Sequence, residues 1–256
     1  MKKILSMLLV LCMALTLCSA AFAEGKSPVD GMTVAFIPKV SGNSFFEAAN
    51  DGAQKYAKEW GLTVDYIGAP TADVTTQLEL IQQAIDKGVD AICISSVDAT
   101  GLDEKLQEAQ DAGIYVSTWD SDVSPNARAL MVSQGTADVL GPMLVEMAVD
   151  SLKERGVDVN GEVKYVWHFS NPSVSDQNSW YVAGDAYIKE KYPTWVAVND
   201  PYYSNQDPAQ SVSVGESILD AYPDIDVIIC NDSTALPGQC KAAENKGKTA
   251  KDITIT

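Results

Sequence analysis

Short apolar runs alternate with longer amphipathic stretches along this chain. In the first half, runs of strand length fall at 33–37, 63–67, 91–95 and 115–119, and a shorter one at 129–132. Segments with apolar residues at helical spacing separate them, at 44–60, 73–87 and 101–112. Such alternation is typical of stacked βα units around a mostly parallel sheet. The pattern therefore predicts an α/β fold.

The segment 73–87 shows the helical pattern most clearly. Val74, Leu78, Ile81 and Ile85 recur at intervals of three or four residues, which places them on one face of a helix. Asp73 precedes them at the position expected for an N-cap. We expect this helix to cover one face of the sheet.

The alternation of apolar runs and amphipathic segments is interrupted at 133–136 and then resumes. A long helix is predicted at 138–155, followed by strands at 163–169, 195–198, 227–230 and from 253 onward, with helices at 176–192, 211–222 and 235–245. We therefore predict two doubly wound parallel-sheet lobes, at 24–134 and 135–256, joined by a hinge. The chain stops inside its last predicted strand, which would lack a covering helix, so we expect a C-terminal part of the protein to be missing.

Residues 1–23 have the features of a secretory signal peptide. Lys2 and Lys3 give a positive start, 4–17 is apolar, and Ala21-Phe22-Ala23 is a small-x-small cleavage site. The apolar run is shorter than the roughly 20 residues that span a membrane. Lipid attachment at Cys18 is disfavoured because the residue before it is not small. We expect an exported, extracytoplasmic protein that begins near Glu24.

The charge and the cysteines exclude several functions. Asp and Glu number 35 against 18 Lys and Arg, a net charge of −17, which disfavours binding to nucleic acid. Cys93 and Cys230 lie in apolar runs and are interpreted as small buried residues, while Cys240 lies on a predicted helix. No cysteine spacing typical of a metal site is present, so neither a metal nor a cofactor is expected.

Polar side chains follow four of the predicted strands. Lys39, Asp120, the pair Asp176-Gln177 and the segment Asn231-Asp232-Ser233 each come shortly after an apolar run. The carboxyl ends of strands form the ligand crevice of an open α/β sheet. We therefore expect these residues to meet in one pocket.

Each candidate has a binding interpretation and a simpler one. The Lys39 ammonium suits a hydroxyl-rich or anionic ligand, unless it is an ordinary solvated lysine. The Asp120 carboxylate can accept two neighbouring hydroxyl donors. Together with Asp122 it could also hold Mg²⁺, although Asp122 is better explained as shaping the turn before Pro125.

The remaining polar candidates lie just before or at the start of predicted helices. Ser175 or Asp176 could cap the helix that follows, and part of 231–233 could do the same. Gln177 offers both a donor and an acceptor.

Other residues in these segments have simpler interpretations. Phe45 and Phe46 are predicted to be core residues, although one of them could stack on a ligand. His168, within an apolar run, is interpreted as structural.

Motifs for enzymatic chemistry are missing from the sequence. It contains no Gly-x-Ser-x-Gly elbow, no Gly-x-Gly-x-x-Gly loop and no Walker-type lysine loop. We therefore expect a binding protein rather than an enzyme.

Several of these segments carry a resemblance to a known family. They are Ala35-Phe36-Ile37-Pro38-Lys39, Thr118-Trp119-Asp120-Ser121-Asp122, Gln134-Gly135-Thr136, Ser175-Asp176-Gln177-Asn178 with Trp180, and Ala235-Leu236-Pro237. The chain resembles the type I periplasmic sugar-binding proteins of ABC transporters, and most closely the Lsr-type receptors for autoinducer-2. This resemblance implies a monomer whose two lobes close on a small hydroxylated ligand and then dock on a membrane permease.

The resemblance also implies which residues bind the ligand. The family's lysine, two aspartates and glutamine correspond to Lys39, Asp120, Asp176 and Gln177. Asn231 and Ser233 stand where the family has a proline and an alanine, so they are included as candidate ligand-binding residues. The hinge is expected at 134–136.

Two alternatives remain open at this stage. The Asn231-Asp232 pair looks like the corresponding loop of pentose and hexose binders, which keeps a sugar such as rhamnose as a candidate ligand. The Asp120-x-Asp122 pair is similar to that of Mg²⁺-dependent haloacid-dehalogenase-like phosphatases. In those enzymes the pair normally follows the first strand, whereas here it follows the fourth.

Overall fold

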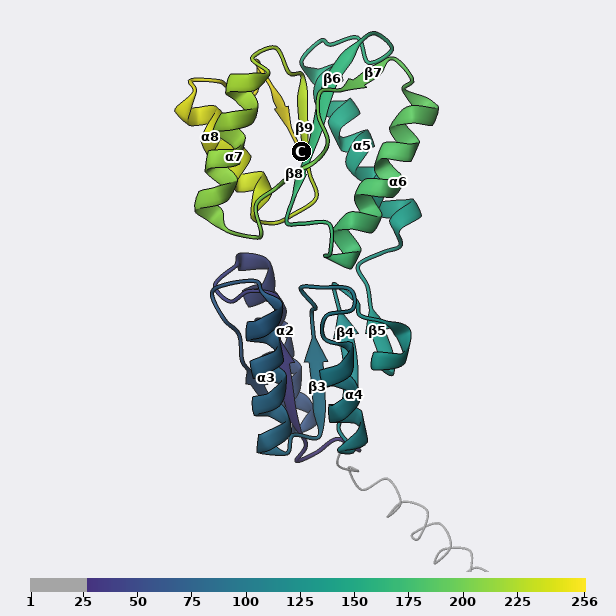
Figure 1. Cartoon of the computed structure of the whole chain (residues 1–256), viewed down its shortest axis with the longest axis vertical. Helices are drawn as coiled ribbons and strands as arrows, with labels where there is room; N and C mark the ends of the chain where they lie inside the picture. The colour runs from purple at the N-terminus through teal and green to yellow at the C-terminus, as the bar shows by residue number, and fades with distance from the viewer. Residues whose placement is uncertain (1–26) are drawn as a thin grey trace, which may run out of the picture.

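The computed structural model describes residues 27–256. The predicted signal peptide at 1–23, with Cys18, lies outside the described residues. The described part forms two α/β lobes, one above the other in Figure 1, each built around a parallel sheet. No helix within 27–256 is both long and apolar enough to cross a membrane.

The N-terminal lobe contains a sheet of five parallel strands in the order β2-β1-β3-β4-β5. The strands are β1 (Thr33–Ile37), β2 (Thr63–Tyr66), β3 (Ala91–Ile94), β4 (Tyr115–Trp119) and β5 (Leu130–Val132). The helices are α2 (Ser44–Trp60), α3 (Val74–Lys87) and α4 (Asp103–Asp111), with a 3₁₀ turn, η2, at Pro125–Ala127. This strand order is that of a doubly wound sheet.

Helices cover both faces of this first sheet. Ile81 of α3 and Leu106 of α4 are fully buried in one core cluster, and Phe46 of α2 packs with Phe36 in another. Helix α3 is capped as its sequence predicts, because Asp73 Oδ1 accepts a hydrogen bond from the Thr76 amide at 2.8 Å. Helices therefore pack against both faces of the sheet.

The C-terminal lobe repeats this arrangement. Its sheet has the order β10-β9-β6-β7, with β8 paired to β6. The strands are β6 (Val163–Phe169), β7 (Trp195–Ala197), β8 (Tyr202–Tyr203), β9 (Val227–Cys230) and β10 (Thr254–Ile255). Helices α5 (Ala137–Glu154) and α6 (Ser175–Lys191) cover one face, and α7 (Pro208–Ala221) and α8 (Ala235–Asn245) the other (Figure 1).

The fold class predicted from the sequence is confirmed, with differences at individual elements. Helix α7 begins at Pro208, three residues before its predicted start, because Asp207 caps it through the Gln210 amide at 2.8 Å and proline suits the first turn. Strand β8 is not predicted at all, since two residues are too few to show a period. Its pairing with the end of β6 defines it.

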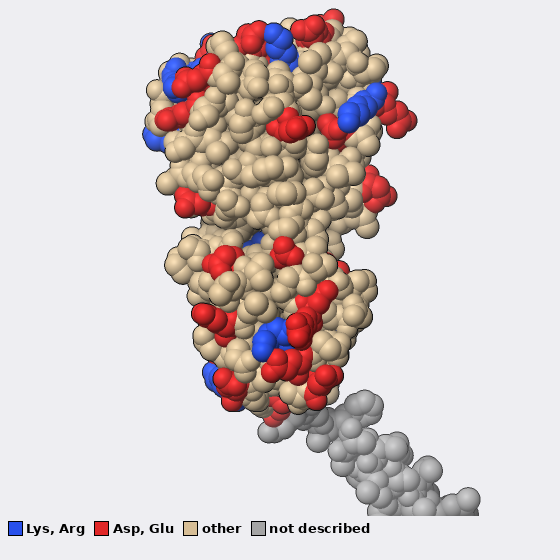
Figure 2. Space-filling model, viewed as in Figure 1, with Lys and Arg blue, Asp and Glu red and all other residues tan. Residues whose placement is uncertain are grey.

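Segment 133–136 carries the chain from β5 in the first lobe to α5 in the second (Figure 1). The predicted boundary after residue 134 falls inside this segment. Figure 2 shows a waist in the molecular surface between the lobes, with acidic and basic side chains interspersed on the visible face. The space between the lobes is where the candidate residues lie.

Candidate functional site

A cavity of about 270 Å³ lies between the carboxyl ends of the two sheets. All six candidate residues predicted from the sequence line it: Lys39, Asp120, Asp176, Gln177, Asn231 and Ser233. They follow strands β1, β4, β6 and β9. In each lobe the cavity therefore adjoins the point where strand order reverses, which is where ligands bind in open α/β sheets.

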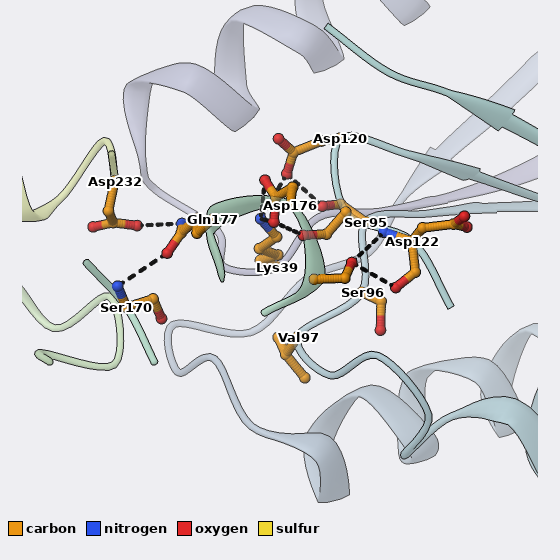
Figure 3. Close-up of polar contacts among 12 residues, drawn as sticks. Lys39, Ser95, Ser96, Val97, Asp120, Asp122, Ser170, Asp176, Gln177 and Asp232 are labelled. Carbon is orange, nitrogen blue, oxygen red and sulfur yellow. Dashed lines mark hydrogen bonds and ion pairs between the residues drawn. The ribbon is translucent and has the colours of Figure 1, made fainter. Parts of the chain in front are cut away.

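Lys39 lies at the centre of the cavity wall, between two carboxylates (Figure 3). Its Nζ is 2.9 Å from Asp120 Oδ2 and 3.2 Å from each carboxylate oxygen of Asp176. Lys39 is only 2 % exposed, so the interpretation as a solvated surface lysine is wrong. Burial lowers the pKa of Lys39, but the charges of Asp176 and Asp120 outweigh it and leave the pKa raised. The ammonium is therefore kept charged.

Asp120 is held by its backbone as well as by its side chain. Its φ of 62° lies in the left-handed region, and its amide donates to the Val132 carbonyl at 3.0 Å. Ser95 Oγ donates to Oδ2 at 2.7 Å, and Gln134 Nε2 donates to Oδ1. Gln134 belongs to the segment that joins the lobes, so this carboxylate connects the inter-lobe segment with the cavity.

Asp176 brings the second lobe onto this cluster. It lies in the first turn of helix α6, and its carboxylate accepts hydrogen bonds from Lys39 and from Ser121 Oγ across the lobe boundary. Burial raises the pKa of the Asp176 carboxyl, and the Lys39 charge opposes this only in part. Two carboxylates thus share one ammonium in a buried cluster that both lobes build.

The capping role considered for Ser175 is not found. The N-cap of α6 is Val174, whose side chain makes no cap hydrogen bond. Ser175 Oγ instead donates to the Asp122 carbonyl and accepts from the Asp122 amide, both at 3.0 Å. This serine contributes a second contact between the lobes.

Gln177, Asn231 and Asp232 form the wall of the second lobe. Gln177 Oε1 accepts from the Ser170 amide at 2.9 Å, and Gln177 Nε2 donates to Asp232 Oδ2 at 2.7 Å (Figure 3). Asn231 Nδ2 donates to the Gln177 carbonyl at 2.6 Å. The other Asp232 oxygen accepts hydrogen bonds from the Thr234 and Ala235 amides, at the start of helix α8. Both amide side chains are thereby fixed in orientation.

Ser233 lies at the exposed edge of the cavity. Asn43 Nδ2 donates to Ser233 Oγ and to Thr234 Oγ1, both at 3.1 Å. Asn43 is also the N-cap of α2, where its Oδ1 accepts from the Phe45 amide. One asparagine of the first lobe thus joins the cap of its own helix to the start of helix α8.

Asp122 takes no part in this cavity. Its side chain points away from Lys39 (Figure 3) and pairs with Arg128, with Nη2 at 2.7 Å and Nε at 3.0 Å. Although burial raises the pKa of Asp122, the hydrogen bonds from Arg128 and Thr118 outweigh it and lower the pKa overall. The two carboxylates therefore have different partners, since Asp120 pairs with Lys39 and Asp122 with Arg128. Within 27–256 no group of three or more His, Cys, Asp or Glu residues is placed to hold a metal ion.

The aromatic residues differ in part from expectation. Phe46 is a core residue at 1 % exposure, but Phe45 is 38 % exposed and lines the cavity, so the prediction that both are core is wrong for Phe45. Its ring stacks near Trp119, with centroids 6.4 Å apart. Trp180 of α6 adds a further aromatic side chain to the lining.

Three polar lining residues are absent from the predicted set: Gln134, Gln206 and Asp232. Gln134 and Asp232 stand in segments that the sequence singles out, whereas Gln206 follows the unpredicted β8 and has no local signal. His168 is fully buried and does not line the cavity, and its Nδ1 lies 2.7 Å from Gln239 Nε2. Burial lowers the pKa of His168 to about 4. Its structural interpretation stands.

Two α/β lobes that enclose a buried polar cavity define a two-lobed ligand-binding protein. The family model described as "Periplasmic binding protein domain" matches residues 34–256, and the chain belongs to this family. The predicted resemblance to type I periplasmic sugar-binding proteins is confirmed.

Relatives and solved structures agree with this assignment. The structure of LsrB from Clostridium saccharobutylicum in complex with AI-2 is 60% identical, with a TM-score of 0.87, over 88% of this chain and 69% of that one. The D-allose-binding periplasmic protein of Escherichia coli is 24% identical over 94% of this chain and 75% of its own length. A D-arabinose complex of a solute-binding protein from Burkholderia graminis is 26% identical, with a TM-score of 0.76, over 90% and 76%.

Proposed function

We propose that this protein is the extracytoplasmic receptor of an ABC importer and binds autoinducer-2 between its lobes. The observation that carries the proposal is the cluster in which Lys39 and Asp120 of one lobe meet Asp176 of the other. The structure that is 60% identical to this chain is a complex with AI-2. At that identity we expect this chain to bind the same or a similar ligand.

The donors and acceptors suit a small polyhydroxylated molecule. Adjacent hydroxyl groups can donate to the Asp120 and Asp176 carboxylates, and charge-assisted hydrogen bonds of this kind are strong. Lys39 can donate to a ring or hydroxyl oxygen of the same molecule. Because the cluster spans both lobes, a ligand bound there favours the closed arrangement.

We further propose how the protein works in its cell. The leader at 1–23 directs export and is removed, the monomer binds its ligand without converting it, and the closed form docks on a membrane permease. Hinge motion is assigned to 134–136, since a few residues of a connecting segment suffice for such closure.

A sugar is the second candidate ligand. The Oδ1 of Asn231, buried at the cavity and without a hydrogen-bond partner among residues 27–256, offers an acceptor that a proline would not provide. Of the relatives named above, one is a D-allose-binding protein and another is a complex with D-arabinose. The phosphatase alternative lacks such support, because Asp122 is paired with Arg128 outside the cavity.

Calorimetric titration tests the proposal. The full-length protein without its leader is titrated with autoinducer-2 precursor, L-rhamnose and D-ribose under identical conditions. Saturable binding of the first alone supports the proposal. Binding of a sugar alone would assign that sugar as the ligand in place of autoinducer-2. Binding of none of the three would refute the proposal.

A further inference from the structure

We infer that Gln206 is a further specificity-determining residue, whose side-chain carbonyl accepts a hydrogen bond from a hydroxyl group of the bound ligand. The inference rests on the proposed function, because it assigns a contact within the same cavity. Gln206 lies between strand β8 and helix α7 and lines the cavity beside Asp232.

The side chain of Gln206 stands where two cavities meet. It lines the ligand cavity and also a neighbouring one of about 450 Å³ that extends towards Asn43 and Pro70. Ser233 is the other residue that lines both. Gln206 is nonetheless only 4 % exposed, so its amide group is withdrawn from bulk solvent.

The hydrogen bonds of Gln206 determine which of its polar atoms is free. Its Nε2 lies 3.2 Å from Asp232 Oδ2. A carboxylate oxygen accepts, so the amide nitrogen must be the atom that faces Asp232. Oε1 is then left as an acceptor, and it has no hydrogen-bond partner within residues 27–256. Buried polar atoms are nearly always paired, so an unpaired one beside a ligand cavity calls for a donor from the ligand.

The backbone at this position is held in an unusual conformation. Asn205 and Gln206 have φ values of 50° and 58°, in the left-handed region that non-glycine residues seldom adopt. The Asn205 amide donates to the Ser170 carbonyl at 2.9 Å, which anchors the turn to the end of β6. Strained residues of this kind gather at ligand sites, where the surrounding structure holds them. Here the strain places the Gln206 side chain at the cavity.

Asn231 shows the same arrangement independently. Its Nδ2 is committed to the Gln177 carbonyl, so its Oδ1 is also a buried acceptor without a partner in the described chain. The wall of the second lobe thus presents two amide oxygens. A ligand that directs hydroxyl hydrogens towards this wall satisfies both, whereas an analogue lacking one of those hydroxyls leaves an acceptor unpaired. Sites built in this way reject the deoxy analogue strongly.

The test compares Gln206→Met with Gln239→Met. Methionine keeps the length of the side chain but removes the amide. Gln239 is a matched control because it is fully buried, bonds through Nε2 to His168 and does not line the ligand cavity. Its Oε1, like that of Gln206, has no hydrogen-bond partner in the described part of the chain. Affinities are measured by calorimetry with whichever of autoinducer-2 precursor, L-rhamnose and D-ribose the wild type binds, and with analogues of it that each lack one hydroxyl.

We expect Gln206→Met to bind the parent ligand about 10-fold to 100-fold more weakly than the wild type. Gln239→Met should remain within about twofold, since it loses a hydrogen bond of similar kind outside the cavity. One deoxy analogue should bind the wild type weakly yet bind Gln206→Met about as well as the parent does. If Gln206 had a purely structural role, the variant would instead bind all ligands more weakly by the same factor.

The outcomes separate the two proposals. If the wild type binds a probe but Gln206→Met retains wild-type affinity or wild-type discrimination among the analogues, the inference is overturned and the proposed function stands. If the wild type binds none of the three probes, both are overturned.

Discussion

Lys39 illustrates how much of this site depends on individual residues. A buried ammonium is costly unless it is paired, and here two carboxylates from different lobes pair with it. Asp120 and Asp122 are two residues apart but have separate roles, because one faces Lys39 and the other faces Arg128. Roles at this scale follow from the partner of each side chain.

Substitution of Asp176 tests its assigned role. In Asp176→Asn the side chain keeps its shape but loses its charge. A hydrogen bond to a charged group contributes about 1.5 to 3 kcal/mol, so each such bond to the ligand becomes weaker in the variant. We expect affinity to fall by about 10-fold to 100-fold in calorimetric titration. Asp122→Asn is the control and should bind normally, because that carboxylate faces Arg128. Equal losses in the two variants would argue against the site.

His168 predicts a dependence of stability on pH. Its pKa is lowered by burial to about 4 in the folded protein, against about 6.5 in an unfolded chain. The unfolded state therefore takes up a proton first as pH falls, and the contribution of His168 to stability is lost between about pH 6.5 and pH 4. The loss reaches about 3 kcal/mol.

Denaturant unfolding of the wild type and His168→Gln at several pH values measures this effect. The difference in unfolding free energy between the two proteins should be constant above about pH 7. It should shift in favour of the variant as pH falls towards 4. A difference that does not vary with pH would show that His168 is not buried in its neutral form.

At the scale of elements, close helix packing shapes the second lobe. Helices α5 and α6 approach at Gly141 and Gly184, where a Cβ on Gly141 would lie 2.6 Å from the Gly184 amide nitrogen and from the Trp180 carbonyl oxygen. Asp176 and Gln177 lie in the first turn of helix α6, so the packing that positions α6 also positions two residues of the site.

Gly141→Ala should therefore destabilise the protein, because backbone atoms cannot move aside as a flexible side chain can. Overpacking of this kind costs about 1 to 3 kcal/mol. Gly52→Ala is the control, since its Cβ would meet nothing within 4 Å and alanine favours the interior of helix α2. Thermal unfolding should show a lower midpoint for the first variant and an equal or higher one for the second. Equal midpoints would contradict the packing argument.

At the scale of the whole molecule, contacts on two sides of the cavity hold the lobes together. Ser175 joins Asp122 on one side, and Asn43 joins Ser233 and Thr234 on the other. The cavity lies between these contacts, so we expect them to stabilise the closed form proposed above and to slow release of the ligand.

The double variant Ser233→Ala, Thr234→Val removes both acceptors of Asn43 and leaves its cap on α2 intact. Each neutral hydrogen bond contributes about 0.5 to 1.5 kcal/mol. We expect ligand dissociation in stopped-flow measurements to quicken by about 3-fold to 10-fold, with little change in the association rate. Unchanged dissociation would show that this contact does not stabilise the closed form.

The hydrophobic periodicity of the sequence, together with the residues that mark where helices and strands begin and end, determined the α/β class, the two lobes and nearly every element. These signals are local in the chain. They also placed Lys39, Asp120, Asp176 and Asn231 at the carboxyl ends of strands, where parallel sheets form their crevices. Local signals failed where no period exists. The two residues of β8 show none, and Gln206, which follows them, was missed.

The tertiary structure decided which of these polar residues share an environment. Lys39 and Asp176 are 137 positions apart and bond to each other, whereas Asp122 leaves the cavity for Arg128 six positions away. A hydrophobic pattern reports which face of an element is buried, but hydrogen bonds depend on distances and angles between elements that only packing sets. The sequence therefore specified the lobes and the candidates, and the packing of the lobes assembled the candidates into one site.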